Sequence, residues 1–558
     1  MATEQASPRA ETASAATVGG GLILATLAAG QFLMTLDSSV MNVSIATVAE
    51  DVGTTVTGIQ TAITLYTLVM ASLMIVGSKV GAVIGHRRAF SLGLIVYGFG
   101  SGITAIAPSL PVLLFGWSLL EGIGAALILP AIVSLVAANV APTGRSAAYG
   151  LIAAAGACAV AVGPLIGGAL TTYASWRWVF AGEVVVVLII LVVSRRIADA
   201  PPASRPKIDG IGAVLSAAGL GMLVFGVLRA GDWGLIQPNT GAPILFGTSL
   251  AIWLIIGGFL VLWLFLLWQV HLERTGAEPL VPPSILRVAQ LRGGLTLFGF
   301  QFFLQAGIFF TIPLFLSIVL ELSAIETGVR LVPLSLSLLA TALGIPRVFP
   351  SASPRRVSRI GLLLMSGGTA VFVGGLDPGA DASIVLVPML LIGGGIGALA
   401  SQLGAVTVSS VPDERSAEVG GLQNTATNLG ASLGTALIGS ILFAVLASSM
   451  LEGVIANPDI PTSVKESATV QLSAGVPFVS NTQLETALDA AGVPPDVADS
   501  AIEINTAARL DGLRTALAAV VLIGILGLFF TGRIPSTPIG HEDPAARPED
   551  GVDEGMLA

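Results

Sequence analysis

The chain has 558 residues, of which 54% are hydrophobic and only 11% are charged, and its mean hydropathy is +0.89. Soluble proteins carry roughly a quarter charged residues, so this composition excludes a globular protein that covers its whole surface with polar groups. The net charge of −9 says little about partners, because the acidic residues gather in one connection and in the C-terminal tail. We expect no nucleic-acid partner.

The residue types that bind metals or form disulfides are scarce. Cys158 is the only cysteine, which excludes a disulfide framework and a cysteine metal site. His86, His271 and His541 fall in or beside polar connections, so we expect neither a metal site nor a cofactor. Residues 1–17 lack the basic start and the cleavage site of a signal peptide, so the first hydrophobic segment should remain as a helix.

Long apolar runs dominate the rest of the chain. Crossing ~30 Å of hydrocarbon takes about 20 helical residues. The runs between polar breaks therefore predict an all-α integral membrane protein with fourteen transmembrane helices. The expected spans are 21–45, 57–80, 89–107, 110–139, 147–172, 178–194, 210–229, 248–270, 293–320, 327–349, 357–376, 383–411, 418–450 and 510–532.

The Arg and Lys residues predict the orientation. With both termini in the cytoplasm, nineteen of the 25 basic residues face the cytoplasm and six face outside. One missed or extra span would invert every later connection and destroy this bias. The excess of Arg over Lys, with abundant Ala and Gly, suggests a GC-rich bacterial genome. We therefore expect a multi-pass protein of a bacterial cytoplasmic membrane.

The connection 451–508 is expected to lie outside, and it holds eight acidic residues against Lys465 alone. The pattern Thr482-x-x-Glu485 resembles a capping box and predicts a short helix. Two interpretations stay open for this connection: a small helical cap, or a role in attracting cations or admitting substrate.

Three sequence patterns recur in the same order in the two halves of the chain. A parallel duplication of this kind is a known plan among transporters, with substrate bound near the midplane between the halves. The recurring pairs, two of them offset by 268 and 270 residues, are Arg87-Arg88-x4-Gly93 with Arg355-Arg356-x4-Gly361, Pro142-x-x-Arg145-Ser146-Ala147 with Pro412-x-x-Arg415-Ser416-Ala417, and Gly-Ile-Gly-Ala at 122–125 with 395–398.

The repeat divides the chain into six, two and six helices. The predicted units are a cytoplasmic tail at 1–18, a six-helix bundle at 19–196, two inserted helices with their loops at 197–291, a second six-helix bundle at 292–533 that includes the acidic connection 451–508, and a disordered cytoplasmic tail at 534–558.

Several segments resemble motifs of one family, the major facilitator superfamily, and specifically its fourteen-span drug:proton antiporter branch. The resemblance covers roughly residues 20–450 and 510–532, and it implies the major facilitator fold and a monomeric, proton-driven exporter. The segments are Leu36-Asp37-Ser38-Ser39-Val40-Met41-Asn42-Val43 in span one, the antiporter motif Gly163-Pro164-Leu165-Ile166-Gly167-Gly168 in span five, Trp176-Arg177-Trp178-Val179-Phe180 after it, and Asn424-Thr425 with Gly430-x-x-x-Gly434 in span thirteen.

Two positions depart from the family pattern. The loop after span two keeps Gly85, Arg87 and Arg88, which the resemblance assigns to cytoplasmic gating, but it has Ala82 where the family has Asp. Span four has Ser118 where the family has an Arg beside its proton site. These departures leave open whether transport is coupled to protons.

Acidic residues inside the spans are candidates for proton coupling, because a carboxylate in the membrane costs several kcal/mol unless it is paired, neutralised or hydrated. Asp37 and Glu121 lie at similar depths, so a meeting of the two in space would let them share a proton. Glu183 lies about a turn and a half into its span, where snorkelling to the interface is the alternative.

Amide side chains inside the spans are candidates for the substrate cavity. Gln301 and Gln305 share one face of span nine among several phenylalanines, and Asn424 and Asn428 repeat this spacing in span thirteen. Gln31 is a weaker candidate. Amides among aromatic rings suit an amphipathic ligand, but they equally suit hydrogen bonds between helices. For the glycines of the antiporter motif, the alternative to a functional role is to allow close contact between helices.

These features predict a secondary active transporter, not an enzyme, that exports hydrophobic or amphipathic small molecules by proton antiport. The proton gradient would supply the energy. Two alternatives remain: an exporter or facilitator of a lipid, amino acid or metabolite with altered or absent proton coupling, and, in a different class, a membrane-embedded transferase. A transferase would need a polar catalytic cluster at one membrane interface.

Overall fold

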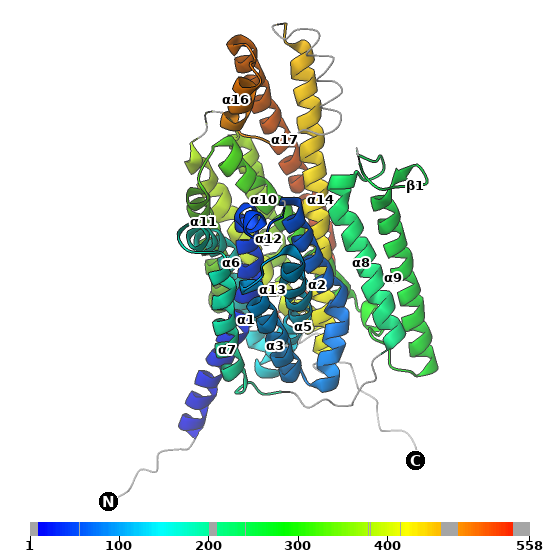
Figure 1. The fold of residues 1–558 in the computed structure, drawn as a ribbon. Coiled ribbons are helices and arrows are strands. Elements are labelled where there is room, and N and C mark those ends of the chain that lie inside the picture. The colour runs from blue at the N-terminus through cyan, green and yellow to red at the C-terminus, as the bar shows by residue number, and fades with distance from the viewer. Residues whose placement is uncertain are drawn as a thin grey trace, which may run out of the picture.

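The computed structural model describes residues 9–54, 56–199, 209–239, 241–377, 379, 381–412, 415–458 and 478–538. Within these ranges the regular secondary structure is helical except for one short hairpin. The helices form one bundle with two helices at its side, and α14, α16 and α17 extend beyond the other helices at one end (Figure 1).

The first run of helices occupies the residues before 197. Helices α2 and α3 are separated by Gly85 alone, whose φ of 97° lies in the region that favours glycine. We call the end of the bundle where α2 ends and α3 begins the inner end, and the opposite end the outer end. The elements are α1 Arg9–Asp51, α2 Val56–Ile84, α3 His86–Ala105, α4 Leu110–Leu113, the π-helix η1 Leu114–Glu121, α5 Gly122–Asn139, η2 Pro142–Gly144, α6 Arg145–Tyr173 and α7 Arg177–Ser194.

Two helices follow at the side of the bundle (Figure 1). Asp209 caps the first helix by accepting a hydrogen bond from Gly212 N at 2.9 Å, and it also accepts one from Gln269 Nε2 of the second helix at 2.8 Å. The Asp209 carboxylate thus links the two helices. The elements are α8 Gly210–Trp233, the antiparallel hairpin of β1 Ile244–Leu245 and β2 Thr248–Ser249, α9 Leu250–Thr275 and η3 Ile285–Arg287.

The second run of helices repeats the packing of the first. Contacts between α1 and α6 correspond to those between α10 and α14, and contacts between α3 and α7 to those between α12 and α17. The two runs meet where α6 packs against α11 and α13 and where α14 packs against α2 and α5. The elements are α10 Ala289–Leu314, the π-helix η4 Phe315–Val319, α11 Ala324–Val348, α12 Pro354–Gly375, η5 Ala382–Val385, α13 Leu386–Val408, α14 Ser416–Ala456, α16 Asn481–Ala490, α17 Pro495–Phe530 and η7 Thr531–Arg533.

Twelve segments of the described chain are helical, long enough and apolar enough to cross a membrane. Each of the fourteen predicted spans corresponds to a helix, but α3 and α6 are not among the twelve. These two helices have 20 and 29 residues and are rich in Gly and Ala, which allows close packing.

Several helix ends differ from the sequence prediction. Helix α1 begins at Arg9, inside the expected tail, and α17 begins at Pro495 instead of near residue 510. Helices α14 and α17 have 41 and 36 residues, or about 60 and 54 Å, so they exceed the ~30 Å of a bilayer core.

A short helix lies in the acidic connection, as predicted, but the predicted capping box was wrong by two residues. Ser480 and Gln483 form the box, and Thr482 lies inside the helix. Residues 459–477 of the connection lie outside the described part of the chain. The predicted tail 534–558 is described only as far as residue 538.

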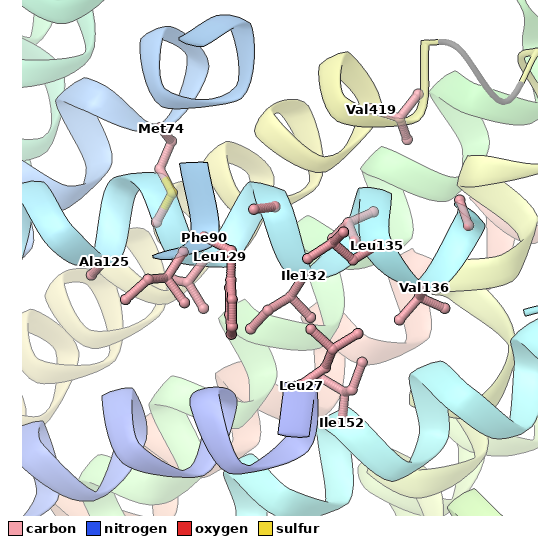
Figure 2. Close-up of a cluster of buried hydrophobic side chains, with 14 of the residues drawn as sticks. Leu27, Met74, Phe90, Ala125, Leu129, Ile132, Leu135, Val136, Ile152 and Val419 are labelled. Carbon is pink, nitrogen blue, oxygen red and sulfur yellow. The ribbon is translucent and has the colours of Figure 1, made fainter. Parts of the chain in front are cut away.

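The core of the first run is centred on α5, which is apolar on all sides and largely buried. Figure 2 shows Leu129, Ile132 and Val136 of α5 among side chains from the neighbouring helices, including Leu27 of α1. Val419 of α14 belongs to the same cluster. The two runs of helices therefore share a packed apolar contact near the inner end.

Candidate functional site

Three acidic side chains from three helices meet inside the first run. Asp37 comes from α1, Glu121 from the last position of η1, and Glu183 from α7. One carboxylate oxygen of each lies within 4.8 Å of the other two, and all three side chains are buried. Asp37 and Glu121 thus meet, and Glu183 joins them in the interior instead of reaching the interface. We call these residues the acidic cluster.

Asp37 has an aromatic partner that the sequence did not indicate. The indole Nε1 of Trp117 donates a hydrogen bond of 2.7 Å to Asp37 Oδ1. Trp117 is fully buried and stacks on Tyr66, with ring centroids 5.2 Å apart and planes 3° apart. The indole ring therefore has one fixed orientation, and its N–H points at the carboxylate.

The two glutamates contact hydroxyl groups of α3. Ser101 Oγ donates to Glu183 Oε2 at 3.1 Å, and Tyr97 OH lies 3.5 Å from the same oxygen. Thr104 Oγ1 lies 3.4 Å from Glu121 Oε1 but only 2.9 Å from the carbonyl oxygen of Gly100. Because a threonine hydroxyl has one hydrogen, Thr104 shares it between the Gly100 carbonyl oxygen and Glu121 Oε1, with the shorter contact to Gly100.

No described cation balances the acidic cluster. Among the residues that the structure describes, no Lys, Arg or His forms an ion pair with any of the three acids. Ser118, at the position where the family has Arg, donates to the carbonyl oxygen of Ala62 at 2.8 Å. One oxygen of each acid also has no hydrogen-bond partner: Asp37 Oδ2, Glu121 Oε2 and Glu183 Oε1.

The backbone around the acidic cluster is unusually close-packed. The π-helix η1 ends at Glu121, and π-helical turns are frequent at functional sites because they redirect side chains. A Cβ atom on Gly100 of α3 would lie 2.8 Å from Glu121 Cγ, and one on Gly116 would lie 2.8 Å from Thr104 Oγ1. Glycine at both positions lets α3 approach η1.

The antiporter-motif residues on α6 pack against the segment of α1 that carries Asp37. Gly163 faces Ser39, and a Cβ atom on Gly167 would lie 2.9 Å from Val40 Cγ1. Gly168 has open space at its Cβ position. The side chain of Pro164 lies outside the described part of the structure. The motif therefore allows close contact between α6 and α1 directly beside the acidic cluster.

The amide candidates fall into two groups. Asn424 and Asn428 donate to carbonyl oxygens one turn earlier in α14, at 2.9 and 2.8 Å, and Gln31 contacts Thr35 of its own helix at 3.3 Å. In α10, the Oε1 atoms of Gln301 and Gln305 have no partner. These two glutamines thus keep an acceptor for a ligand, whereas the asparagine amides are already engaged.

The predicted gating residues contact the end of α7 and the residues that directly follow it. The carboxylate of Asp199 accepts hydrogen bonds from the backbone N–H groups of His86 and Arg87 at 3.1 and 3.3 Å. Arg87 Nη1 donates to the carbonyl oxygens of Arg195 and Ile197 at 3.3 Å each. Arg88 is exposed. Together these contacts fasten the start of α3 to the chain that follows α7.

The contact between the two runs at the inner end uses a different pair. Lys79 Nζ of α2 lies 3.6 Å from Glu418 Oε1 in the first turn of α14, with side chains 6% and 11% exposed. Lys79 also donates to the carbonyl oxygen of Pro279 at 3.2 Å. A Cβ on Gly421 would lie 2.8 Å from Ser78 Oγ. The sequence did not indicate this ion pair.

Comparison with known proteins agrees with this architecture. The chain is 29% identical over 424 residues to the puromycin resistance protein of Streptomyces alboniger, covering 75% of this chain and 81% of that protein. It is 29% identical over 444 residues to the cephamycin export protein of Amycolatopsis lactamdurans, covering 78% and 87%.

Two solved structures share the fold. The human organic anion transporter MFSD10 has a TM-score of 0.55 at 13% identity, covering 92% of this chain and 98% of that chain. The proton:xylose symporter XylE has a TM-score of 0.54 at 12% identity, covering 94% and 98%. The family model described as Major Facilitator Superfamily matches residues 27–435, most of the chain, and the chain therefore belongs to the major facilitator superfamily.

Proposed function

We propose that this secondary transporter exports hydrophobic or amphipathic small molecules in exchange for protons. Transport itself follows from membership of the major facilitator superfamily, whose members are transporters and not enzymes. The observation that carries the proton step is the acidic cluster: three buried carboxyl groups within 4.8 Å, with no described cation beside them.

Like charges explain why this cluster would hold protons. Two carboxylates in contact already resist joint ionisation, and three in a low-dielectric interior resist it more strongly. Asp37, with the Trp117 N–H as donor, is the member best able to carry the remaining charge.

A metal ion is the competing occupant for the same three acids. Ca²⁺ and Mg²⁺ take six or more oxygen ligands. Besides the six carboxyl oxygens, the hydroxyl groups of Ser101, Thr104 and Tyr97 lie at the cluster, a set of oxygens that a metal ion could also use. We propose protons as the occupants, because a proton neutralises a carboxyl group without a coordination shell.

Alternation between a state open at the inner end and a state open at the outer end would connect proton binding with export. Opening of the inner end would have to separate α2 from α14 and break the ion pair between Lys79 and Glu418. The antiporter-motif glycines hold α6 against α1 beside Asp37, so a shift of α6 would reach the acidic cluster directly. In this scheme substrate leaves to the outside and protons leave to the cytoplasm.

The expected substrate class rests on the relatives and on α10. The similar proteins include ones named for puromycin resistance, cephamycin export and tetracenomycin C resistance and export. Gln301 and Gln305 keep free acceptor oxygens on α10, where Phe298 and Phe302 stack with centroids 6.4 Å apart. Amide acceptors among aromatic rings suit an amphipathic organic molecule.

The membrane topology is also part of the proposal. With α3 and α6 counted as spans beside the twelve apolar ones, the chain crosses the membrane fourteen times, in a pattern of six, two and six. An even number places both termini on one side, and the Arg and Lys bias places that side in the cytoplasm. The inner end is then cytoplasmic, and the working unit is a monomer in a bacterial cytoplasmic membrane.

A second candidate is export of a lipid, amino acid or metabolite without proton coupling. Ala82 and Ser118 favour it, because the family's Asp and Arg are absent from these positions. The two candidates differ in one measurable property, the response of transport to a pH gradient.

The test is uptake into proteoliposomes with an imposed pH gradient, using puromycin, ethidium and a panel of lipids and amino acids. Gradient-driven uptake of an amphipathic probe, lost more than about tenfold in Asp37→Asn and Glu121→Gln, is expected. Glu452→Gln, which changes an exposed acid at the outer end, is the matched control and should behave as wild type. Uptake that ignores the gradient would reject proton coupling and favour the second candidate.

A further inference from the structure

An arginine-lined groove lies at the inner end between α3 and the end of α7. Its volume is about 490 Å³, and it opens to the surroundings of the bundle. No acidic side chain lines it. The lining residues are Arg87, Arg88, Ser91, Leu92, Ile95 and Arg195.

The three arginines of this groove are not equivalent. The Arg87 guanidinium group is already hydrogen-bonded within the protein, because its Nη1 donates to the carbonyl oxygens of Arg195 and Ile197. The side chains of Arg88 and Arg195 are exposed and form no hydrogen bond or ion pair with any residue in the described ranges. Asp199, the acid nearest in sequence to Arg195, already accepts two backbone hydrogen bonds at the start of α3. Two guanidinium groups therefore remain available to an anion.

The groove continues into an apolar surface. Leu92 and Ile95 of α3 are 43% and 55% exposed, and Leu188 and Val192 of α7 are 57% and 63% exposed. In a transporter these outward-facing side chains contact lipid chains. The groove has positive charge at one end and an apolar surface at the other, which match the headgroup and the acyl chains of an anionic phospholipid. Basic pockets between transmembrane helices on the cytoplasmic side bind such headgroups.

We propose that this groove binds one anionic phospholipid of the cytoplasmic leaflet. Arg88 and Arg195 contact the headgroup phosphate with bidentate guanidinium hydrogen bonds, as arginine is suited to do. One acyl chain lies along Leu92 and Ile95. A bound lipid joins the start of α3 to the end of α7. These two helices carry Ser101 and Glu183, which are hydrogen-bonded to each other at the acidic cluster.

The test is native mass spectrometry of the purified full-length protein, titrated with phosphatidylglycerol or with phosphatidylcholine of the same chains. One phosphatidylglycerol should bind more tightly than all later ones. Each arginine near an anionic surface contributes about fivefold in affinity, so Arg88→Gln with Arg195→Gln should weaken this binding about 25-fold. Arg196→Gln, an exposed neighbour outside the groove lining, is the control and should keep the tight site.

Other outcomes would overturn the proposal. Equal binding of the two lipids, or equal loss in Arg196→Gln, would show that the groove does not select the headgroup. Displacement by glycerol phosphate at the same concentration would assign the site to a free phosphate, and binding only after removal of residues 541–558 would assign the groove to that acidic tail. Arg88→Lys with Arg195→Lys retains charge but loses the bidentate contacts, so its affinity should lie between those of the wild type and the double Gln variant. This partial retention separates lost binding from misfolding.

Discussion

The indole Nε1 of Trp117 donates a 2.7 Å hydrogen bond to Oδ1 of Asp37, and both side chains are buried. Stacking on Tyr66 fixes the indole ring, so this donor stays directed at the carboxylate. A fixed N–H stabilises the ionised form of Asp37 relative to the protonated form. In the proposed mechanism Trp117 therefore sets how readily the acidic cluster releases its last proton.

Trp117→Phe removes this donor and keeps an aromatic ring. A hydrogen bond to a charged group contributes about 1.5–3 kcal/mol, and 1.36 kcal/mol corresponds to roughly one pH unit. Asp37 should then release its proton only at higher pH, so the pH of half-maximal transport should rise by about one to two units. Trp178→Phe on the exposed face of α7 is the control. An unchanged pH profile in Trp117→Phe would contradict this role.

The ion pair between Lys79 and Glu418 should hold the inner end closed. Removing one partner of a buried pair costs about 3–5 kcal/mol, because the other charge stays buried and unpaired. Lys79→Ala and Glu418→Ala should therefore shift the protein toward an open inner end. Spin labels at positions 196 and 348, in the two runs of helices, would report a longer distance.

The charge-reversed double variant supplies the control for that experiment. Lys79→Glu with Glu418→Lys restores an opposite-charge pair, and it should recover a large part of the closed population that Lys79→Glu alone loses. A double variant as open as the single one would show that the pair does not couple the two runs.

Gly100 should be intolerant of even a methyl group. A Cβ atom there would lie 2.6 Å from the carbonyl oxygen of Gly116 and 2.8 Å from Glu121 Cγ, so α3 and η1 would have to move apart. Gly100→Ala should lower the free energy of unfolding by about 1–3 kcal/mol and impair transport. Gly102→Ala, whose Cβ would meet Val184 Cγ2 at 3.9 Å, should fold and transport as wild type. Thermal unfolding in detergent would detect the difference.

Acidic pH should release the short helix α16 from the connection between η4 and α11, where Glu321 lies. Glu321 accepts hydrogen bonds from Thr482 N at 3.1 Å and Thr482 Oγ1 at 2.5 Å, and these hold the pKa of Glu321 below its ordinary value of 4.5. A lowered pKa in the folded state contributes stability above pH 4.5, which is lost as the pH falls through the lowered value.

A fluorescent label at position 485, introduced as Glu485→Cys in a Cys158→Ser background, would follow this release. Its mobility should rise only at acidic pH in the otherwise wild-type chain, and already at neutral pH when Glu321→Gln is added. Equal mobility in both proteins at neutral pH would argue against the contact.

The hydropathy pattern and the few acidic residues inside apolar runs made the helices and part of the acidic cluster predictable. The helices lie where the apolar runs are, because lipid-facing and buried helices both need apolar side chains on every side. Asp37 and Glu121 were recognisable because a carboxylate in an apolar run is costly and therefore has a reason to be there.

The remaining features depend on contacts that no local pattern encodes. In the sequence, nothing distinguishes Trp117 from other tryptophans in transmembrane helices. Its contact with Asp37 arises because α1 lies beside η1. The burial of Glu183 was underestimated because depth was counted along one helix, whereas packing of α7 on α3 decides its exposure. The pair of Lys79 and Glu418 exists only where α2 crosses α14.

The central claim is that the acidic cluster holds protons at neutral pH, and infrared spectroscopy of the protein in lipid measures this directly without a substrate. A protonated carboxyl group has a C=O stretching band distinct from that of a carboxylate, and this band shifts in D₂O. The wild type should have such a band at pH 7, and Glu121→Gln and Glu183→Gln should each reduce it, whereas Glu452→Gln should not. A wild-type spectrum without the band, or the same band in the triple variant of Asp37→Asn, Glu121→Gln and Glu183→Gln, would contradict the claim.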